Sequence, residues 1–132
     1  MQINKETSCK KKSVILFADD NDVVLDVGEK LLQKLGYQPL LAKSGQEAIE
    51  VFKKNQKEVD LTILDMRMPD LSGLEIFAEI NKIRPGFKVL IMSGDPEDDR
   101  IEELLSLGCI GFMPKPFSVE MLDQKIRENL CA

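Results

Sequence analysis

Four short apolar runs, each continuous rather than alternating with polar residues, constrain the fold of this chain more than any other feature. The runs are Val14–Ala18, Leu61–Leu64, Val89–Met92 and Ile110–Met113. A strand is continuously apolar when both of its faces are buried, as in a parallel sheet covered by helices on both sides. The stretch Gln38–Ala42 is a weaker fifth run, which suits a strand at the edge of such a sheet.

Segments with helical periodicity follow each of these runs, and each segment has a recognisable start or end signal. The signals are Asn21 and Gly36 for the first helix, Ser44 with Glu47 for the second, Ser72 with Glu75 for the third, Asp95-Pro96 and Gly108 for the fourth, and Ser118 for the fifth. The two Ser/Glu pairs have the spacing of a capping box. Five strands that alternate with five helices predict one doubly wound α/β domain over residues 13–130.

Composition excludes several classes of function. The 132 residues include no histidine, which excludes Ser-His-Asp and Cys-His catalysis and His-ligated zinc. With 18 basic and 23 acidic residues the net charge is −5, which argues against direct binding to nucleic acid or to anionic membranes. Three cysteines without CxxC spacing favour a reducing, cytoplasmic location, and no apolar run is long enough to span a membrane. The polar residues 1–12 are expected to be a disordered leader.

Polar residues follow the predicted strands at the edge where parallel α/β sheets bind their ligands. Asp19 and Asp20 follow the first run, Asp65 the third and Ser93 the fourth, and Lys115 lies just past the fifth. Three carboxylates at one edge repel one another strongly unless Lys115 and a hard cation such as Mg²⁺ neutralise them. Such a set is equipped for phosphoryl transfer, with Asp65 as the nucleophile that attacks phosphorus in line.

The order of these motifs resembles the receiver domain of bacterial two-component response regulators. The motifs are Asp19-Asp20, Asp65 followed by Met68-Pro69 and Gly73, Ser93-Gly94, and Lys115-Pro116. The resemblance covers about residues 13–130 and implies a flavodoxin-like (βα)5 three-layer sandwich with strand order 2-1-3-4-5. It implies a phosphorelay phosphoacceptor that catalyses only its own phosphorylation and dephosphorylation. The length leaves no room for an output domain, so we expect a stand-alone receiver or one cut from a longer protein.

The resemblance implies a role for each residue of the acidic set. Asp65 is the phosphoryl acceptor. Asp19, Asp20 and Asp65 hold Mg²⁺, for which Mn²⁺ can substitute, and the backbone carbonyl of Arg67 is a further ligand. Lys115 contacts a phosphoryl oxygen.

The resemblance also implies a switch. Ser93 is the hydroxyl that moves onto the phosphoryl group, and Phe112 matches the aromatic switch position, although it can equally be a core residue of the fifth strand. The Lys115–Pro116 peptide bond is expected to be cis. Arg67 and Asp95 flank the acceptor and the hydroxyl, where they can screen the water that ends the signal.

The implied partners are a sensor histidine kinase or a histidine phosphotransfer domain as donor, and a downstream protein. The downstream protein is expected to bind the surface formed by the fourth helix, the fifth strand and the fifth helix. Two stretches, Ile91–Gly94 and Gly111–Phe117, look most like receivers attached to hybrid sensor histidine kinases.

Three other functions fit the sequence less well. An aspartate-nucleophile phosphatase needs a second Asp as general acid at the position of Arg67. A flavodoxin-like electron carrier needs a hydroxyl- and glycine-rich phosphate loop, whereas the acidic run Asp19–Asp22 repels an FMN phosphate. The intact acidic set also disfavours an interaction module that is never phosphorylated.

Overall fold

The fold of this chain was determined as a computed structural model that describes residues 13–130, so the predicted leader at 1–12 lies outside the described residues. Its strands are β1 (Val14–Ala18), β2 (Gln38–Ala42), β3 (Val59–Asp65), β4 (Val89–Ser93) and β5 (Gly111–Pro114). All neighbouring strands pair in parallel, and their order is β2-β1-β3-β4-β5. The predicted doubly wound sheet and its strand order are confirmed.

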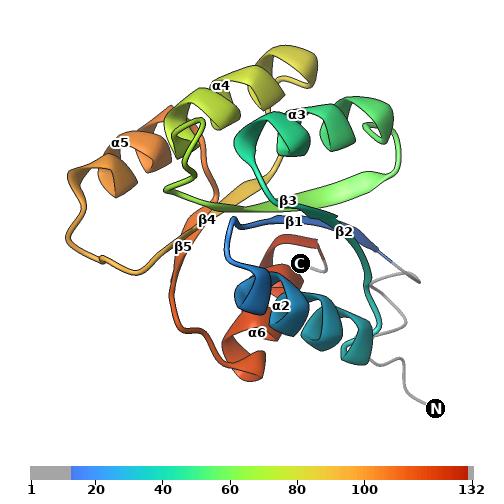
Figure 1. The fold of residues 1–132 in the computed structure, drawn as a ribbon. Helices are drawn as coiled ribbons and strands as arrows, with labels where there is room; N and C mark the ends of the chain where they lie inside the picture. Colours follow the sequence, from blue (N-terminus) through green and yellow to red (C-terminus); the bar gives the residue numbers. More distant parts are fainter. Residues whose placement is uncertain (1–12, 131–132) are drawn as a thin grey trace.

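Helices cover both faces of this sheet. They are α2 (Asp22–Lys34), α3 (Gly45–Lys54), α4 (Gly73–Ile83), α5 (Asp99–Leu107) and α6 (Val119–Leu130). Helices α2 and α6 lie on one face, and α3, α4 and α5 lie on the other (Figure 1). The result is a three-layer sandwich with a separate apolar core on each side of the sheet.

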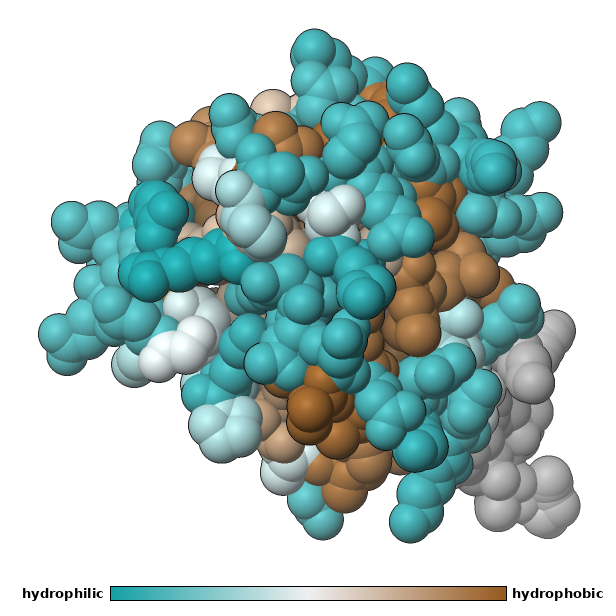
Figure 2. Space-filling model, viewed as in Figure 1, coloured by the Kyte–Doolittle hydropathy of each residue, from teal (hydrophilic) through white to brown (hydrophobic). Residues whose placement is uncertain are grey.

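Strand β1 shows why the apolar runs are continuous. Ile15 and Phe17 are fully buried in the core beneath α2 and α6, whereas Leu16 and Ala18 are fully buried in the core beneath α3, α4 and α5. Successive side chains point to opposite faces of a strand, so a strand with a core on each side needs apolar residues at every position. The viewed surface, by contrast, is mostly hydrophilic with smaller apolar patches (Figure 2). None of the helices within residues 13–130 has the length and apolar character needed to traverse a membrane.

The N-caps predicted for α2, α3 and α4 are confirmed, but the predicted role of the Glu47 side chain at the start of α3 is not. Asn21 caps α2, and Ser72 forms a complete capping box with Glu75 at the start of α4. Ser44 caps α3 as predicted, but the Glu47 carboxylate accepts the N–H of Lys43, so the second half of that capping box is wrong.

The predicted start of the fourth helix is also wrong. Helix α5 begins at Asp99, and its N-cap is Asp98 rather than Asp95. The Asp98 carboxylate accepts the N–H of Arg100 and two bonds from the Arg100 guanidinium, whereas the backbone of Asp95 is bonded to the Ser93 hydroxyl. Which of the neighbouring acids caps the helix therefore depends on the hydrogen-bond partners of each. A sequence pattern for helix caps does not include those partners.

One buried polar atom offers a test of the core. Among the described residues, the hydroxyl of Thr62 in the middle of β3 is the only buried side-chain polar atom without a hydrogen-bond partner. Replacement by the isosteric Val removes that unpaired hydroxyl, so Thr62→Val should raise the free energy of unfolding by about 1 kcal/mol in urea denaturation. Thr62→Ser, which keeps the hydroxyl and loses the methyl group, should lower it. A less stable Thr62→Val protein would contradict this assignment.

Candidate functional site

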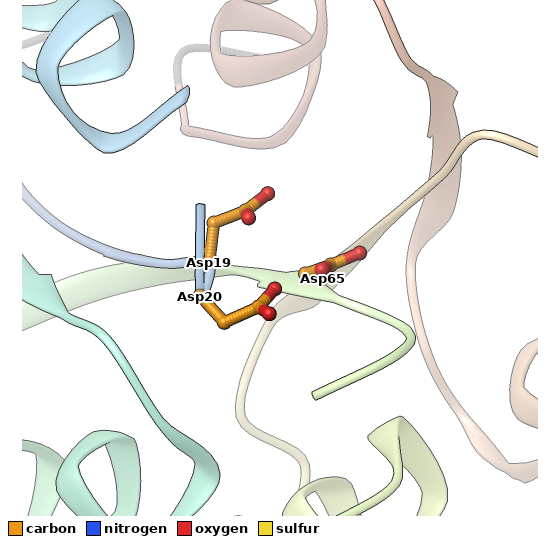
Figure 3. A group of neighbouring side chains, drawn as sticks. All are labelled: Asp19, Asp20 and Asp65. Carbon is orange, nitrogen blue, oxygen red and sulfur yellow. The ribbon is translucent and has the colours of Figure 1, made fainter. Parts of the chain in front are cut away.

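Three carboxylates meet at the carboxyl ends of β1 and β3. Strands β1 and β3 pair in parallel with Ala18 beside Leu64, so the next residues, Asp19 and Asp65, emerge side by side. One oxygen each of Asp19, Asp20 and Asp65 lies within 4.8 Å of the others. Figure 3 shows the three side chains extending from the two strand ends. Asp19 and Asp65 are buried and Asp20 is exposed, so the cluster opens to solvent on one side.

Lys115 faces this cluster. The Nζ of Lys115 donates a hydrogen bond to Asp19 Oδ2 at 2.9 Å and lies 3.4 Å from Asp65 Oδ1. The backbone N–H of Lys115 donates to the Ser93 carbonyl at 2.9 Å, which fixes the lysine at the end of β4. The Lys115–Pro116 peptide bond is cis, the geometry that the resemblance implies. Burial lowers the pKa of Lys115, but its bond to Asp19 and the charges of Asp65 and Asp19 raise it above its ordinary value, so the ammonium stays charged.

One ammonium does not neutralise three carboxylates. Burial, followed by the charge of Asp19, raises the pKa of Asp65 from its ordinary value of 3.8 to about 6, although Lys115 and the backbone N–H of Arg67 lower it. An ionised Asp65 is therefore unfavourable in the site by itself. An all-oxygen set with excess negative charge is what a hard divalent cation prefers, so the residues present fit a divalent metal site.

The Ser93 hydroxyl lies at the end of β4 but is occupied within its own loop. Strand β4 pairs with β3 so that Met92 is beside Asp65, which places Ser93 near Asp65 along the sheet edge. Its buried hydroxyl donates to the Asp95 carbonyl at 3.2 Å and accepts the Asp95 N–H at 3.0 Å. Contact with a phosphoryl group on Asp65 thus requires Ser93 to release Asp95.

Phe112 lies in β5, and Arg67 lies in the loop that follows Asp65. Phe112 is half-buried in β5 and packs against the core beneath α3, α4 and α5. That position suits both a switch residue and a core residue. The Arg67 side chain is directed to Asp98, with Nη2 3.1 Å from Oδ2.

Two carboxylates beyond the acidic set hold the loop that follows Asp65. Asp70 accepts the N–H groups of Gly45 and Gln46 at 2.9 Å each, which joins this loop to the start of α3. Those bonds lower the pKa of Asp70. Asp98 joins the same loop to the start of α5 through Arg67. Sequence reasoning missed both links, because neither lies within the span of a local capping pattern.

Comparison with known proteins agrees with the fold and the acidic cluster. Residues 15–127 match the family model for the response regulator receiver domain. The sensor kinase CckA of Brucella abortus is 33% identical over 129 residues, which is 98% of this chain and 14% of that protein. The sporulation initiation phosphotransferase F of Bacillus subtilis is 30% identical over 116 residues, which is 88% of this chain and 92% of that protein.

A solved structure is similar over most of its length. The response regulator receiver domain protein from Clostridium thermocellum has a TM-score of 0.86 and 32% identity, covering 89% of this chain and 94% of that one. Several curated relatives are much longer, however. The chain spans 14% of the kinase named above and 27% of the transcriptional regulatory protein GlrR of Escherichia coli.

Because the pKa of Asp65 is raised, replacing its carboxyl group by a neutral amide is expected to stabilise the folded protein. Because the folded-state pKa exceeds the ordinary value, the stability due to its proton is present below pH 3.8 and is lost as pH rises through about 6. Asp65→Asn should therefore raise the free energy of unfolding at pH 7.5 by about 1–3 kcal/mol without divalent metal. Urea denaturation with and without Mg²⁺ tests this, and Mg²⁺ should stabilise the wild type more than the variant. An Asp65→Asn protein less stable than the wild type would refute the raised pKa of Asp65.

Proposed function

The chain belongs to the response regulator receiver domain family, and we propose that Asp65 accepts a phosphoryl group from the phosphohistidine of a sensor histidine kinase or a histidine phosphotransfer domain. Receiver domains are signalling phosphoacceptors of two-component systems rather than true enzymes. The observation that carries the proposal is the cluster of Asp19, Asp20 and Asp65 with oxygens within 4.8 Å. The match to the sporulation phosphotransferase over 92% of that protein supports it.

The proposed transfer begins at the Asp65 carboxylate. One of its oxygens attacks phosphorus in line, the P–N bond of the donor histidine breaks, and that nitrogen keeps the electron pair and takes a proton from solvent. Burial and the charge of Asp19 leave the ionised Asp65 poorly stabilised in the site. The acyl phosphate brings further negative charge, which Lys115 and a bound cation would have to neutralise. Asp19, Asp20, Asp65 and the Arg67 carbonyl would hold Mg²⁺, or Mn²⁺ in its place, which when bound neutralises phosphoryl oxygens.

Lys115 and Ser93 are the proposed groups that stabilise the product. The Lys115 ammonium, already 3.4 Å from Asp65 Oδ1, needs only a small displacement to contact a phosphoryl oxygen. The Ser93 hydroxyl exchanges its bond to the Asp95 carbonyl for a charge-assisted bond to another phosphoryl oxygen. Movement of Ser93 frees space beside β4 that the half-buried ring of Phe112 can enter, which makes Phe112 the proposed switch residue.

The proposed output surface consists of α5, β5 and α6. Its helix α5 carries two exposed leucines, Leu105 and Leu107, which suit contact with a downstream protein. We also infer a cytoplasmic location, where the free buried thiol of Cys109 stays reduced. Attachment to a hybrid sensor kinase remains part of the proposal, supported by the similarity to the sensor kinase of Brucella abortus.

The phosphatase alternative is not supported by the site. The position that needs a general acid holds Arg67, whose guanidinium is paired with Asp98. The site therefore lacks, at that position, the general acid that a phosphatase needs to turn over small phosphoesters.

Acetyl phosphate, a small acyl phosphate, tests the proposal without knowledge of the natural donor. Wild-type protein with Mg²⁺ should gain the mass of one phosphoryl group, and Asp65→Asn or added EDTA should prevent the gain. Asp60→Asn is a matched control, because Asp60 lies at the opposite end of β3 and accepts the N–H of Val14. Intact-mass spectrometry measures each case. Equal labelling of the wild type and Asp65→Asn would disprove the proposed acceptor.

A further inference from the structure

A network of two arginines and one aspartate joins the loop at residues 66–72, which follows the proposed acceptor Asp65 and is called the acceptor loop below, to helix α5. The Arg67 guanidinium donates to Asp98 Oδ2 at 3.1 Å. The Arg100 guanidinium donates to both oxygens of the same carboxylate, through Nε at 3.0 Å and Nη2 at 2.7 Å. Asp98 is also the N-cap of α5. Arg100, followed by Arg67, holds the pKa of the Asp98 carboxyl far below its usual range, so Asp98 is charged at neutral pH.

Arg67 can leave this network without leaving Asp98 unpaired. Its side chain is 63% exposed, whereas that of Asp98 is 7% exposed. If Arg67 leaves, Asp98 keeps the two guanidinium bonds of Arg100 and its bond to the Arg100 N–H, so the carboxylate is not left unpaired. A hollow of about 420 Å³, lined by residues 66–72 and Arg100, gives the Arg67 side chain room to move.

Arg67 is also close to the proposed phosphorylation site in the chain. It is the second residue after Asp65, and its backbone N–H lowers the pKa of the Asp65 carboxyl. A phosphoryl group on Asp65 adds a strongly charged acceptor of arginine bonds beside it. Two guanidinium groups share the one carboxylate of Asp98, so a phosphoryl group on Asp65 would compete with that carboxylate for Arg67.

We propose that Arg67 exchanges Asp98 for a phosphoryl oxygen when Asp65 is phosphorylated, and that this exchange releases the acceptor loop from the start of α5. The inference rests on the proposed function and adds a second connection between the acceptor and the output surface, separate from Ser93 and Phe112. In the resting protein the Arg67–Asp98 pair opposes the phosphorylated state, because the pair must break before Arg67 can contact the phosphoryl group.

Asp98→Asn tests the exchange. Asn is as good an N-cap as Asp, so the helix keeps its cap while Arg67 loses the carboxylate. Beryllofluoride with Mg²⁺ serves as the phosphoryl mimic, and backbone amide NMR measures its half-saturating concentration. A freed Arg67 should lower that concentration about two- to fivefold in Asp98→Asn, the range of a partly exposed ion pair. Arg100→Gln, the matched control, keeps the Arg67–Asp98 pair and should leave the concentration unchanged or raise it.

A double variant separates the exchange from a general loosening of α5. In an Arg67→Gln background, Asp98→Asn should have no further effect on the half-saturating concentration. An equal reduction in that background, or a reduction in Arg100→Gln, would overturn the exchange. Equal values for the wild type and Asp98→Asn would overturn it too. Failure of the wild type to bind beryllofluoride, or binding that survives in Asp65→Asn, would instead refute the proposed function.

Discussion

Repulsion among three carboxylates is the constraint on which the rest of this structure depends. The oxygens of Asp19, Asp20 and Asp65 approach within 4.8 Å, and Lys115 supplies the positive charge paired with Asp19 and Asp65. Two of the acids are buried, so water screens them poorly. Such a cluster persists only because the two apolar cores and the β1–β3 register hold the strand ends in place. The fold thus holds together a negatively charged site that a divalent cation would neutralise.

The acceptor loop is held from both sides by helix starts. Asp70 bonds to the start of α3, and Arg67 bonds to the N-cap of α5. The first link joins a carboxylate to backbone N–H groups and is independent of the charge on Asp65. The second joins two side chains, one of them largely exposed, so it can respond to a new charge beside it. This asymmetry indicates that the loop stays anchored at α3 while its connection to α5 changes.

Sequence patterns predicted most of the fold and the acidic set because both follow from local order along the chain. The continuous apolar runs identified a sheet buried on two faces, and the residues after those runs contained Asp19, Asp65 and Lys115. The errors concern which partner a side chain binds, because the Glu47 carboxylate accepts the N–H of Lys43 and not that of Ser44. Asp98 rather than Asp95 caps α5, in part because it pairs with Arg67, 31 residues earlier. The roles proposed for Ser93 and Phe112 belong to a second state, which a single set of contacts does not contain.

Titration of the Asp65 carboxyl carbon by NMR measures the central claim directly. In protein with selectively labelled aspartate, assigned with Asp65→Asn, the wild-type signal of Asp65 should titrate near pH 6 without divalent metal. Saturating Mg²⁺ should move that midpoint downward, because the cation favours the ionised form. A midpoint near the ordinary value of 3.8 in both conditions would show that neither burial nor the charge of Asp19 disfavours the ionised Asp65, and would contradict this account.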